Sequence, residues 1–507
     1  MKEETIKEVS ELFTKVLVVQ PSDNPKELFA DHVKIREVLA KVSAEQTPFV
    51  PNKDRASKIP AFLDWAKKAN IKFDNVTVQK SDKGYSLVAK NPLKTDSIAV
   101  EVPRSAILTT DSSKINKGLR ELFFKDQLVL SIENCPLVLL LAHEMLDSGS
   151  HWQPYLDILP GDVVSVLSMS NDELLALKPS LAFVLALQFF RCIARHYVYF
   201  LLMTVNSSLT SKLLPKQGTD AIRKTLFTSQ NFTFELYAWC MAIVTSRVNR
   251  VPNLVQVGPK TTTSPALIPM MDFANFEFVA DINAAQSEVF YAIPQKKVQF
   301  LVHRDVEANT ELVLQIGSKT NRDCLIYSGF VPVESNPMDV YELRLGFPKG
   351  TPQWKIICAQ RMGVLSPNEY GATFIIHLAT FYAHQLEYAA FWNFAKLFVA
   401  TSMAEFNTEA NVITAKDYLL KRFELYLAGY RDLAASEPKN GTLAARYAWR
   451  LKKSEKDILE EMVKYFSQSN ETIITSNGSI QPPPLATAED TSEEAITDGV
   501  EQLQVGA

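Results

Sequence analysis

The sequence predicts an α+β fold in which a long helical insertion splits the strands and a helical C-terminal domain follows. Short strand-like runs bounded by Gly, Pro, Asn and Asp occur between residues 76 and 108. Helical periodicity fills residues 115–255, strand-like runs return at 289–314, and helices again account for 354–466. At 507 residues the chain is long enough to bury two or three cores.

The N-terminal region is expected to be helical. Apolar residues recur at helical spacing between Ile6 and Phe13, and again between Val33 and Val42. Pro21 and Pro25 separate these two helices. A shorter helix is expected around residues 62–66.

The strands are expected to be short and paired through hairpins. The first group comprises residues 76–78, 85–89 and 98–102, and Gly84 occupies a natural hairpin position. In the second group, residues 293–298 form the turn of a hairpin, and a further strand is expected at 340–346.

Two helices dominate the predicted insertion. Residues 181–205 are so apolar that a buried helix is expected, and a second helix covers 235–248 and ends near Pro252. The aromatic-rich stretch 354–466 predicts a separate helical bundle.

These patterns divide the chain into six parts. The last of them contains no Lys or Arg and is expected to be disordered. The parts are an N-terminal helical segment (1–72), the first strand region (73–114), the helical insertion (115–260), the second strand region (261–335), the C-terminal helical domain (336–466) and the acidic tail (467–507).

Composition limits the classes of function. The net charge of −4 argues against nucleic acid, because phosphate binding needs clustered Lys and Arg. Five scattered cysteines show no zinc-ligand spacing and no disulfide framework, so no metal is expected. No secretory signal and no run long enough to span a bilayer is visible. A monomeric cytoplasmic protein is expected, with the nucleus as a second location and without membrane association.

Two segments about 40 residues apart carry the most specific information. Residues 266–276 read ALIPMMDFANF and residues 311–317 read ELVLQIG. Together with Ser328-Gly329-Phe330, they resemble the S-adenosylmethionine (SAM) pocket of SET-domain protein methyltransferases. The order of strands, insertion and helical domain resembles the subclass that contains the Rubisco and actin-histidine methyltransferases. Matches at 151–155 and 245–252 favour the actin-histidine branch.

The resemblance implies SAM as the cofactor and assigns residues to it. Arg55 matches a residue that contacts the SAM carboxylate, although on residue type alone it also fits an ordinary surface arginine. A turn at residues 83–85 would wrap SAM with its backbone, and it equally fits a plain hairpin. The implied cofactor-binding residues are Arg55, Lys83, Gly84, Tyr85, Asp272, Asn275, Phe276 and Gly317.

The sequence departs from the family pattern close to the expected chemistry. Ile316 stands where the family has a Tyr that lines the methyl-transfer channel, and Phe276 replaces a His. Lys83 replaces a Glu, and Met271 replaces a Trp beside the substrate slot. Loss of one preorganised polar group typically lowers a rate about 10- to 1000-fold. Ile316 is therefore the substitution that bears most on activity.

Asn249 and Arg247 are the remaining catalytic candidates. In the resembled branch the matching Asn orients the substrate imidazole, although Asn249 also fits a helix C-terminal cap. The resemblance implies methyl transfer to a histidine ring nitrogen, with actin as the protein partner. Two alternatives remain open: a catalytically degenerate SET protein that binds a protein without methylating it, and a protein-lysine methyltransferase.

Overall fold

A computed structural model describes residues 1–81, 84–255, 261–315, 317–384, 386 and 389–477. The chain divides into two compact units. The first comprises Met1–Met338 with Pro438–Arg450, and the second comprises Asp339–Glu437 with the chain from Leu451 onward. Among the described residues, no helix combines the length and the apolar character that a bilayer crossing requires.

The first unit begins with three helices that the sequence pattern anticipates. They are α1 (Glu3–Leu12), continued by a π-helical turn (Phe13–Leu17), α2 (Pro25–Ser43) and α3 (Arg55–Lys68). Helix α2 starts where the Asn24 side chain accepts a hydrogen bond from the backbone N–H of Lys26 (3.0 Å). The break predicted at the two prolines is therefore confirmed.

The strands of the first unit form several small sheets. Strand β9 shows why they form: its side chains alternate between buried and partly exposed, so that Val298, Phe300 and Val302 enter the core. The sheets are β1–β2, β3–β9–β8, β4–β6–β5 and the parallel pair β10–β7. The strands are β1 (Val76–Ser81), β2 (Gly84–Ala89), β3 (Ile98–Pro103), β4 (Leu108–Thr109), β5 (Asn249–Pro252), β6 (Thr263–Leu267), β7 (Asn275–Glu277), β8 (Ser287–Ala292), β9 (Lys297–Val302) and β10 (Val313–Gln315).

A helical insertion separates β4 from β5. Its helices are α4 (Lys117–Lys125), α5 (Gln127–Ser131), α6 (Cys135–Leu146), α7 (Gln153–Leu156), α8 (Asn171–Leu175), α9 (Ala182–Thr204), α10 (Thr210–Leu213), α11 (Lys216–Ile222) and α12 (Phe234–Arg247). Helix α9 is buried along most of its length, as its apolar sequence predicts. Short helical turns follow in the second strand region: Met271–Phe273, Ile282–Ala284, α13 (Asn321–Asp323) and Cys324–Ser328.

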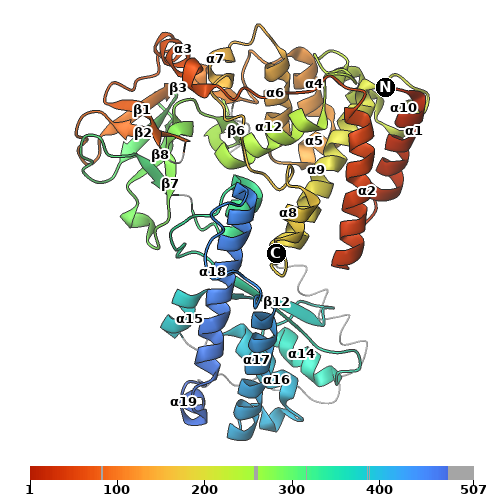
Figure 1. Ribbon diagram of the computed structural model, residues 1–507, viewed down its shortest axis with the longest axis vertical. Coiled ribbons are helices and arrows are strands. Elements are labelled where there is room, and N and C mark those ends of the chain that lie inside the picture. Colours follow the sequence, from red (N-terminus) through yellow and green to blue (C-terminus); the bar gives the residue numbers. More distant parts are fainter. Residues whose placement is uncertain (82–83, 256–260, 316, 385, 387–388, 478–507) are drawn as a thin grey trace. The chain divides into compact units, whose positions relative to one another are not determined.

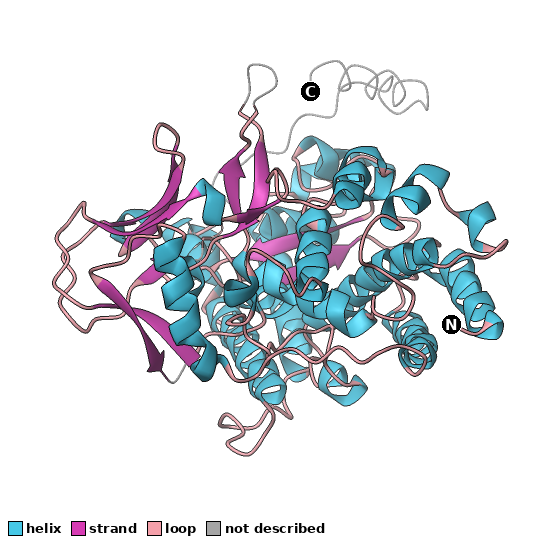
Figure 2. Ribbon diagram, turned by 90° about the horizontal axis from the view of Figure 1, so that it is seen from above, coloured by secondary structure: helices cyan, strands magenta, loops and turns pink. Residues whose placement is uncertain are grey.

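Most strands of the first unit lie away from its N-terminal helices. Strands β1, β2, β3, β7 and β8 lie at one side and helices α1 and α2 lie at the other, while β6 lies between them near α12 (Figure 1). The view from above in Figure 2 shows several strands together at one edge and helices at the opposite edge. A large hydrophobic core runs from α1 through the insertion to the strands. This order of elements agrees with the α+β fold predicted from the sequence.

The second unit has its own core and is mainly helical. It contains α14 (Gln353–Arg361), α15 (Leu378–His384), α16 (Ala390–Val399), α17 (Glu409–Ala428), most of α18 (Leu443–Phe466) and α19 (Asn470–Thr475). The strand expected at 340–346 is present as β11 (Tyr341–Gly346). Its partner β12 (Gly371–Ile376) lies in a stretch predicted as helical, and it forms because Phe374 and Ile376 alternate into the core.

Helix α19 lies within the segment predicted to be a disordered tail. The Ser469 hydroxyl caps it by accepting a hydrogen bond from the Thr472 N–H (3.2 Å), and Ile473 is fully buried. One buried apolar residue and one cap therefore extend the folded unit beyond the predicted end at 466. The remainder of the predicted tail, from residue 478, lies outside the described residues.

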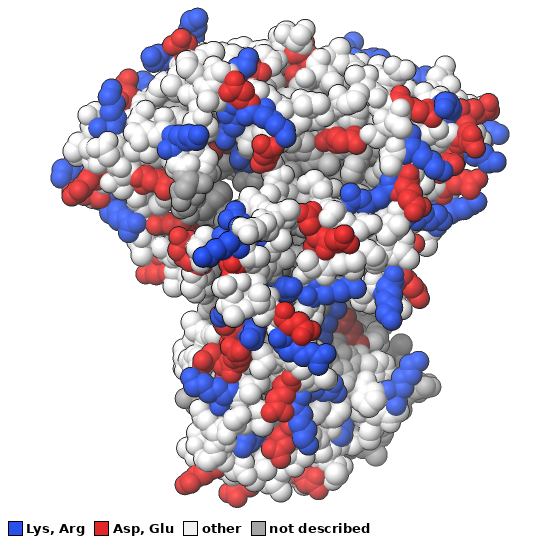
Figure 3. Space-filling view, in the orientation of Figure 1, with Lys and Arg blue, Asp and Glu red and all other residues white. Residues whose placement is uncertain are grey.

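Charge is mixed on the surface. On the face drawn in Figure 3, basic and acidic side chains alternate over both units without a broad area of one sign. This face provides no extended track for a phosphate backbone.

Candidate functional site

The two segments that resemble a SAM pocket meet in the structure. Strand β7 pairs with β10 in parallel, which places Asn275 opposite Val313 and Phe276 opposite Leu314. The Asn275 amide donates hydrogen bonds to Ser86 Oγ (3.0 Å) and Glu311 Oε1 (2.5 Å). Ser86 comes from β2, so three separate parts of the chain fix the orientation of this amide.

A cluster of charged and aromatic side chains surrounds Asp272. The Tyr155 hydroxyl donates a short hydrogen bond to Asp272 Oδ2. Arg55 and Arg247 both act electrostatically on this carboxylate. The cluster joins α3, α7, the end of α12 and the turn before β7. Tyr155, to which the sequence assigns no role, is completely buried.

Arg55 is held in place by several contacts. Its Nε donates to the Ile158 carbonyl (2.6 Å). Its guanidinium carbon lies 5.2 Å from the centre of the Tyr85 ring and 5.6 Å from that of Phe273. Burial, and then the nearby Arg247, lower the pKa of Arg55 to about 10. Arg55 is therefore an ordered, partly buried cation that remains charged at neutral pH.

Burial also acts on the acids of the cluster. It raises the pKa of Asp272 to about 6, although Arg247, the Tyr155 hydroxyl and Arg55 each oppose the rise. Burial and the neighbouring Asp272 raise the pKa of Tyr155 well above its usual range. The cluster thus contains two guanidinium groups and one carboxyl group that is only weakly acidic. The net charge of the cluster is therefore positive.

Arg247 has unused hydrogen-bonding capacity. Its Nη1 donates to Ser246 Oγ (2.6 Å), whereas its buried Nε has no hydrogen-bond partner among the described residues. A buried donor without a partner is costly, so such atoms commonly mark the place of a ligand or water.

Two glycines in the segments predicted to bind SAM have accessible backbones. Gly84 has φ +110° and Gly317 has φ +83°, conformations that L side chains rarely adopt. A Cβ atom at either position would meet no atom within 4 Å, so both backbones face open space. The Gly317 N–H donates to the side chain of Gln315 (2.8 Å). Both glycines therefore permit close approach of a ligand.

Asn249 begins β5, directly after helix α12. Its Nδ2 donates a hydrogen bond to the carbonyl of Arg247, the last residue of α12 (3.1 Å). This contact agrees with the interpretation of Asn249 as a helix C-terminal cap. Strand pairing places Asn249 opposite Ala266 of β6, the strand that leads into the Asp272 turn. Arg247 and Asn249 therefore lie two residues apart at one junction.

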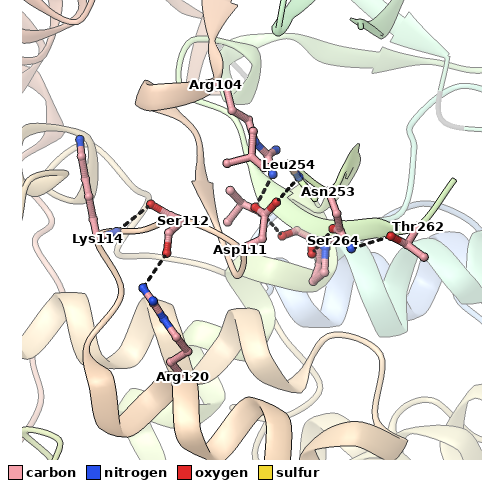
Figure 4. A network of polar contacts seen from close by, with 11 residues as sticks. Arg104, Asp111, Ser112, Lys114, Arg120, Asn253, Leu254, Thr262 and Ser264 are labelled. Carbon is pink, nitrogen blue, oxygen red and sulfur yellow. Dashed lines mark hydrogen bonds and ion pairs between the residues drawn. The ribbon is translucent and has the colours of Figure 1, made fainter. Parts of the chain in front are cut away.

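A polar network supports the far end of β5 (Figure 4). Asp111 Oδ2 accepts the backbone N–H of Leu254 (2.8 Å), and Oδ1 pairs with the buried guanidinium of Arg104. Arg104 also lies over the Tyr291 ring, 5.9 Å from its centre. The network ties the β5–β6 hairpin, which carries Asn249, to the segment around β4.

Two of the substituted positions, Phe276 and Met271, are described, and both contribute apolar packing. The Phe276 ring stacks on Phe330 with centres 6.4 Å apart, and Met271 is buried in the core. Ile316 and Lys83, two of the predicted site residues, lie outside the described residues. Within the described part of the chain, no group of three or more His, Cys, Asp and Glu is arranged to hold a metal ion.

Comparison with solved structures identifies the fold. The SET domain of LSMT bound to lysine and AdoHcy superimposes with a TM-score of 0.60 over 87% of this chain and 99% of that chain, at 16% identity. Rubisco LSMT bound to AdoMet gives a TM-score of 0.59 over 88% of this chain, at 17% identity. The chain has the SET fold. The fold predicted from the sequence is confirmed.

Two curated proteins that are similar in sequence to this chain carry the same name. The actin-histidine N-methyltransferase of Canis lupus familiaris is 26% identical over 349 residues, which are 68% of this chain and 55% of the relative. The Drosophila melanogaster protein of the same name is 25% identical over 346 residues, 65% of this chain and 61% of the relative. The chain thus matches little more than half the length of these relatives. No family model matches the chain.

Proposed function

We propose that this chain is a SAM-dependent protein methyltransferase whose acceptor is a histidine ring nitrogen, with actin as the first candidate substrate. The observation that carries the proposal is the cluster of Arg55, Arg247 and Asp272, with its unpaired buried Nε. The SET fold and relatives named actin-histidine N-methyltransferase support it.

The described residues fit the chemical parts of SAM. Arg55 and Arg247 would hold its carboxylate, and Asp272, ionised above pH 6, would accept from its ammonium group. The backbones at Gly84 and Gly317, together with Asn275, would hold the remainder. When bound, SAM supplies a methyl group on a positively charged sulfur.

The chain's contribution to catalysis would be alignment. In-line displacement depends on the angle and distance between acceptor and methyl carbon, so orienting groups matter more than proton transfer. The Asn249 amide would fix which imidazole nitrogen faces the methyl group. A histidine, with a pKa near 6.5, is largely neutral at pH 7, whereas a lysine near 10.4 must first lose a proton. This difference favours histidine over lysine for a pocket in which Ile replaces Tyr.

Calorimetry of SAM binding tests the cofactor assignment. We expect the Arg247→Met variant to lose about tenfold to a hundredfold in affinity, because hydrogen bonds between charged groups contribute about 1.5–3 kcal/mol. Arg250→Met is the matched control, since Arg250 lies three residues away and pairs instead with Glu133. Absence of SAM binding by the wild type, or an equal loss in both variants, would contradict the proposal.

Intact-mass analysis of unmethylated actin tests the transfer step, and peptide mapping assigns the acceptor as histidine or lysine. The second candidate function is a degenerate SET protein that binds a partner without methylating it. The apolar packing of Phe276 and Met271 favours this candidate. SAM binding without transfer, with transfer gained in Ile316→Tyr, would support it. Efficient transfer by the wild type would exclude it.

A further inference from the structure

A cavity of about 450 Å³ lies in the first unit, apart from the residues described above. Its walls come from α2, α9, α12, the segment around residues 49–51 and the loop around 161–168. Helices α2 and α12 both pack against α9. The volume lies within the range of sites for small organic ligands, about 300–1,000 Å³.

The walls are mostly apolar and aromatic. Leu39, Phe49 and Phe190 line the cavity together with Trp239 of α12. The indole N–H of Trp239 is already used, since it donates to the Pro160 carbonyl (3.0 Å). The aromatic walls thus offer packing surface and few free hydrogen-bonding groups.

Arg36 is the cation that lines this mostly apolar cavity. Arg36 Nη1 donates to the Met169 carbonyl (2.5 Å), and the guanidinium carbon lies 5.7 Å from the centre of the Phe190 ring. No ion pair joins Arg36 to a carboxylate among the described residues, and burial lowers its pKa. The planar guanidinium matches a carboxylate in geometry.

The acid of the cavity is placed differently. Glu235 lies in the first turn of α12, is exposed, and accepts a hydrogen bond from Ser43 Oγ (2.9 Å). Solvent screens such an exposed charge more strongly than the partly buried Arg36. The positive charge of Arg36 therefore determines the electrostatic potential inside the cavity. A singly charged anion complements this single guanidinium better than a phosphate dianion does.

We propose that this cavity binds a small amphipathic carboxylate, with the carboxylate on Arg36 and the apolar body against Phe190 and Trp239. The site is distinct from the candidate SAM site, because its lining residues include none of those assigned to SAM. The loop at residues 158–161 runs between them: the Ile158 carbonyl accepts from Arg55, and the Pro160 carbonyl accepts from Trp239. A ligand in the cavity is thus expected to bind together with SAM.

Calorimetry with sodium decanoate tests the proposal, and decylammonium chloride is the matched probe with the opposite charge. We expect decanoate to bind the full chain with one site and decylammonium to bind at least tenfold more weakly. Arg36→Gln should weaken decanoate about tenfold to a hundredfold, Arg36→Lys should weaken it less, and Glu235→Gln should not weaken it. Ala242→Phe, which places a ring in the cavity from α12, should abolish binding.

Several results would overturn the assignment. They are equal binding of decanoate and decylammonium, unchanged decanoate affinity in both Arg36→Gln and Ala242→Phe, and displacement of decanoate by SAM. A melting curve of each variant checks that it is folded. If Arg36→Gln fails to fold, the Arg36→Lys and Ala242→Phe variants still decide the question.

Discussion

Replacement of Asp272 by Asn removes a carboxyl group whose ionisation opposes folding. The pKa of Asp272 is about 6 in the folded chain, against 3.8 for the unperturbed group, so the folded chain holds this proton more tightly than the unfolded chain. The resulting stabilisation is complete below pH 3.8 and is lost as the pH rises through 6. Because each pKa unit corresponds to about 1.36 kcal/mol, the total is about 3 kcal/mol.

Most of this change lies in an accessible range. About 2 kcal/mol of it falls between pH 4.5 and 7.5. The Asp272→Asn variant lacks this pH-dependent change in stability. The free energy of unfolding of the variant minus that of the wild type should therefore increase by about 2 kcal/mol between pH 4.5 and pH 7.5. Urea unfolding of both proteins at several pH values measures the difference.

The matched control is Glu101→Gln. Hydrogen bonding from Lys297 lowers the pKa of Glu101 to about 2, so this carboxylate stabilises the fold above pH 4.5 and loses that effect as the pH falls towards 2. The Glu101→Gln difference should therefore be nearly constant above pH 5 and should drift in the opposite direction below it. A difference for Asp272→Asn that does not vary with pH would refute the reasoning about burial.

Three further outcomes follow from the local geometry. Gly84→Ala should cost about 1–2 kcal/mol in stability, because its Cβ meets open space and only the positive φ is strained. Gly329→Ala should cost more than Gly84→Ala, because its Cβ would lie 2.2 Å from the Val164 carbonyl oxygen; equal urea midpoints would contradict this. Asp111→Ala should cost about 3 kcal/mol in urea unfolding, since it leaves Arg104 buried without its ion pair, and a loss under 1 kcal/mol would show that Arg104 finds another partner.

The fold could be predicted because its signals are local. Gly84 and the hairpin at 293–298 fall at strand ends, and the apolar helix at 181–205 matches α9 within one residue at each end. The strand β12 and the helix α19 were harder to predict. Each is short and depends on one or two side chains that reach a core formed by distant residues.

Some residues of the candidate site could likewise be predicted from the sequence, and others could not. Arg55, Asp272 and Asn275 could be selected because short motifs surround them. Tyr155 could not be given a role, because its partner Asp272 is 117 residues away and the contact exists only once the insertion folds back on the strands. The unpaired Nε of Arg247 was equally invisible, since hydrogen-bond satisfaction is a property of the assembled site.

The energetic cost of the cluster of Arg55, Arg247 and Asp272 bears on the choice between the two candidate functions, methyl transfer and binding without methylation. Arg55, Arg247 and Asp272 are partly removed from water, and burial raises the pKa of Asp272 more than its charged and hydrogen-bonding neighbours lower it. A site used only as scaffold would gain stability from apolar replacements, as the packing of Phe276 and Met271 illustrates. A zwitterionic ligand would supply the missing carboxylate to the two arginines and an ammonium to Asp272. The cluster therefore supports the proposed binding of an amino-acid group independently of whether methyl transfer follows.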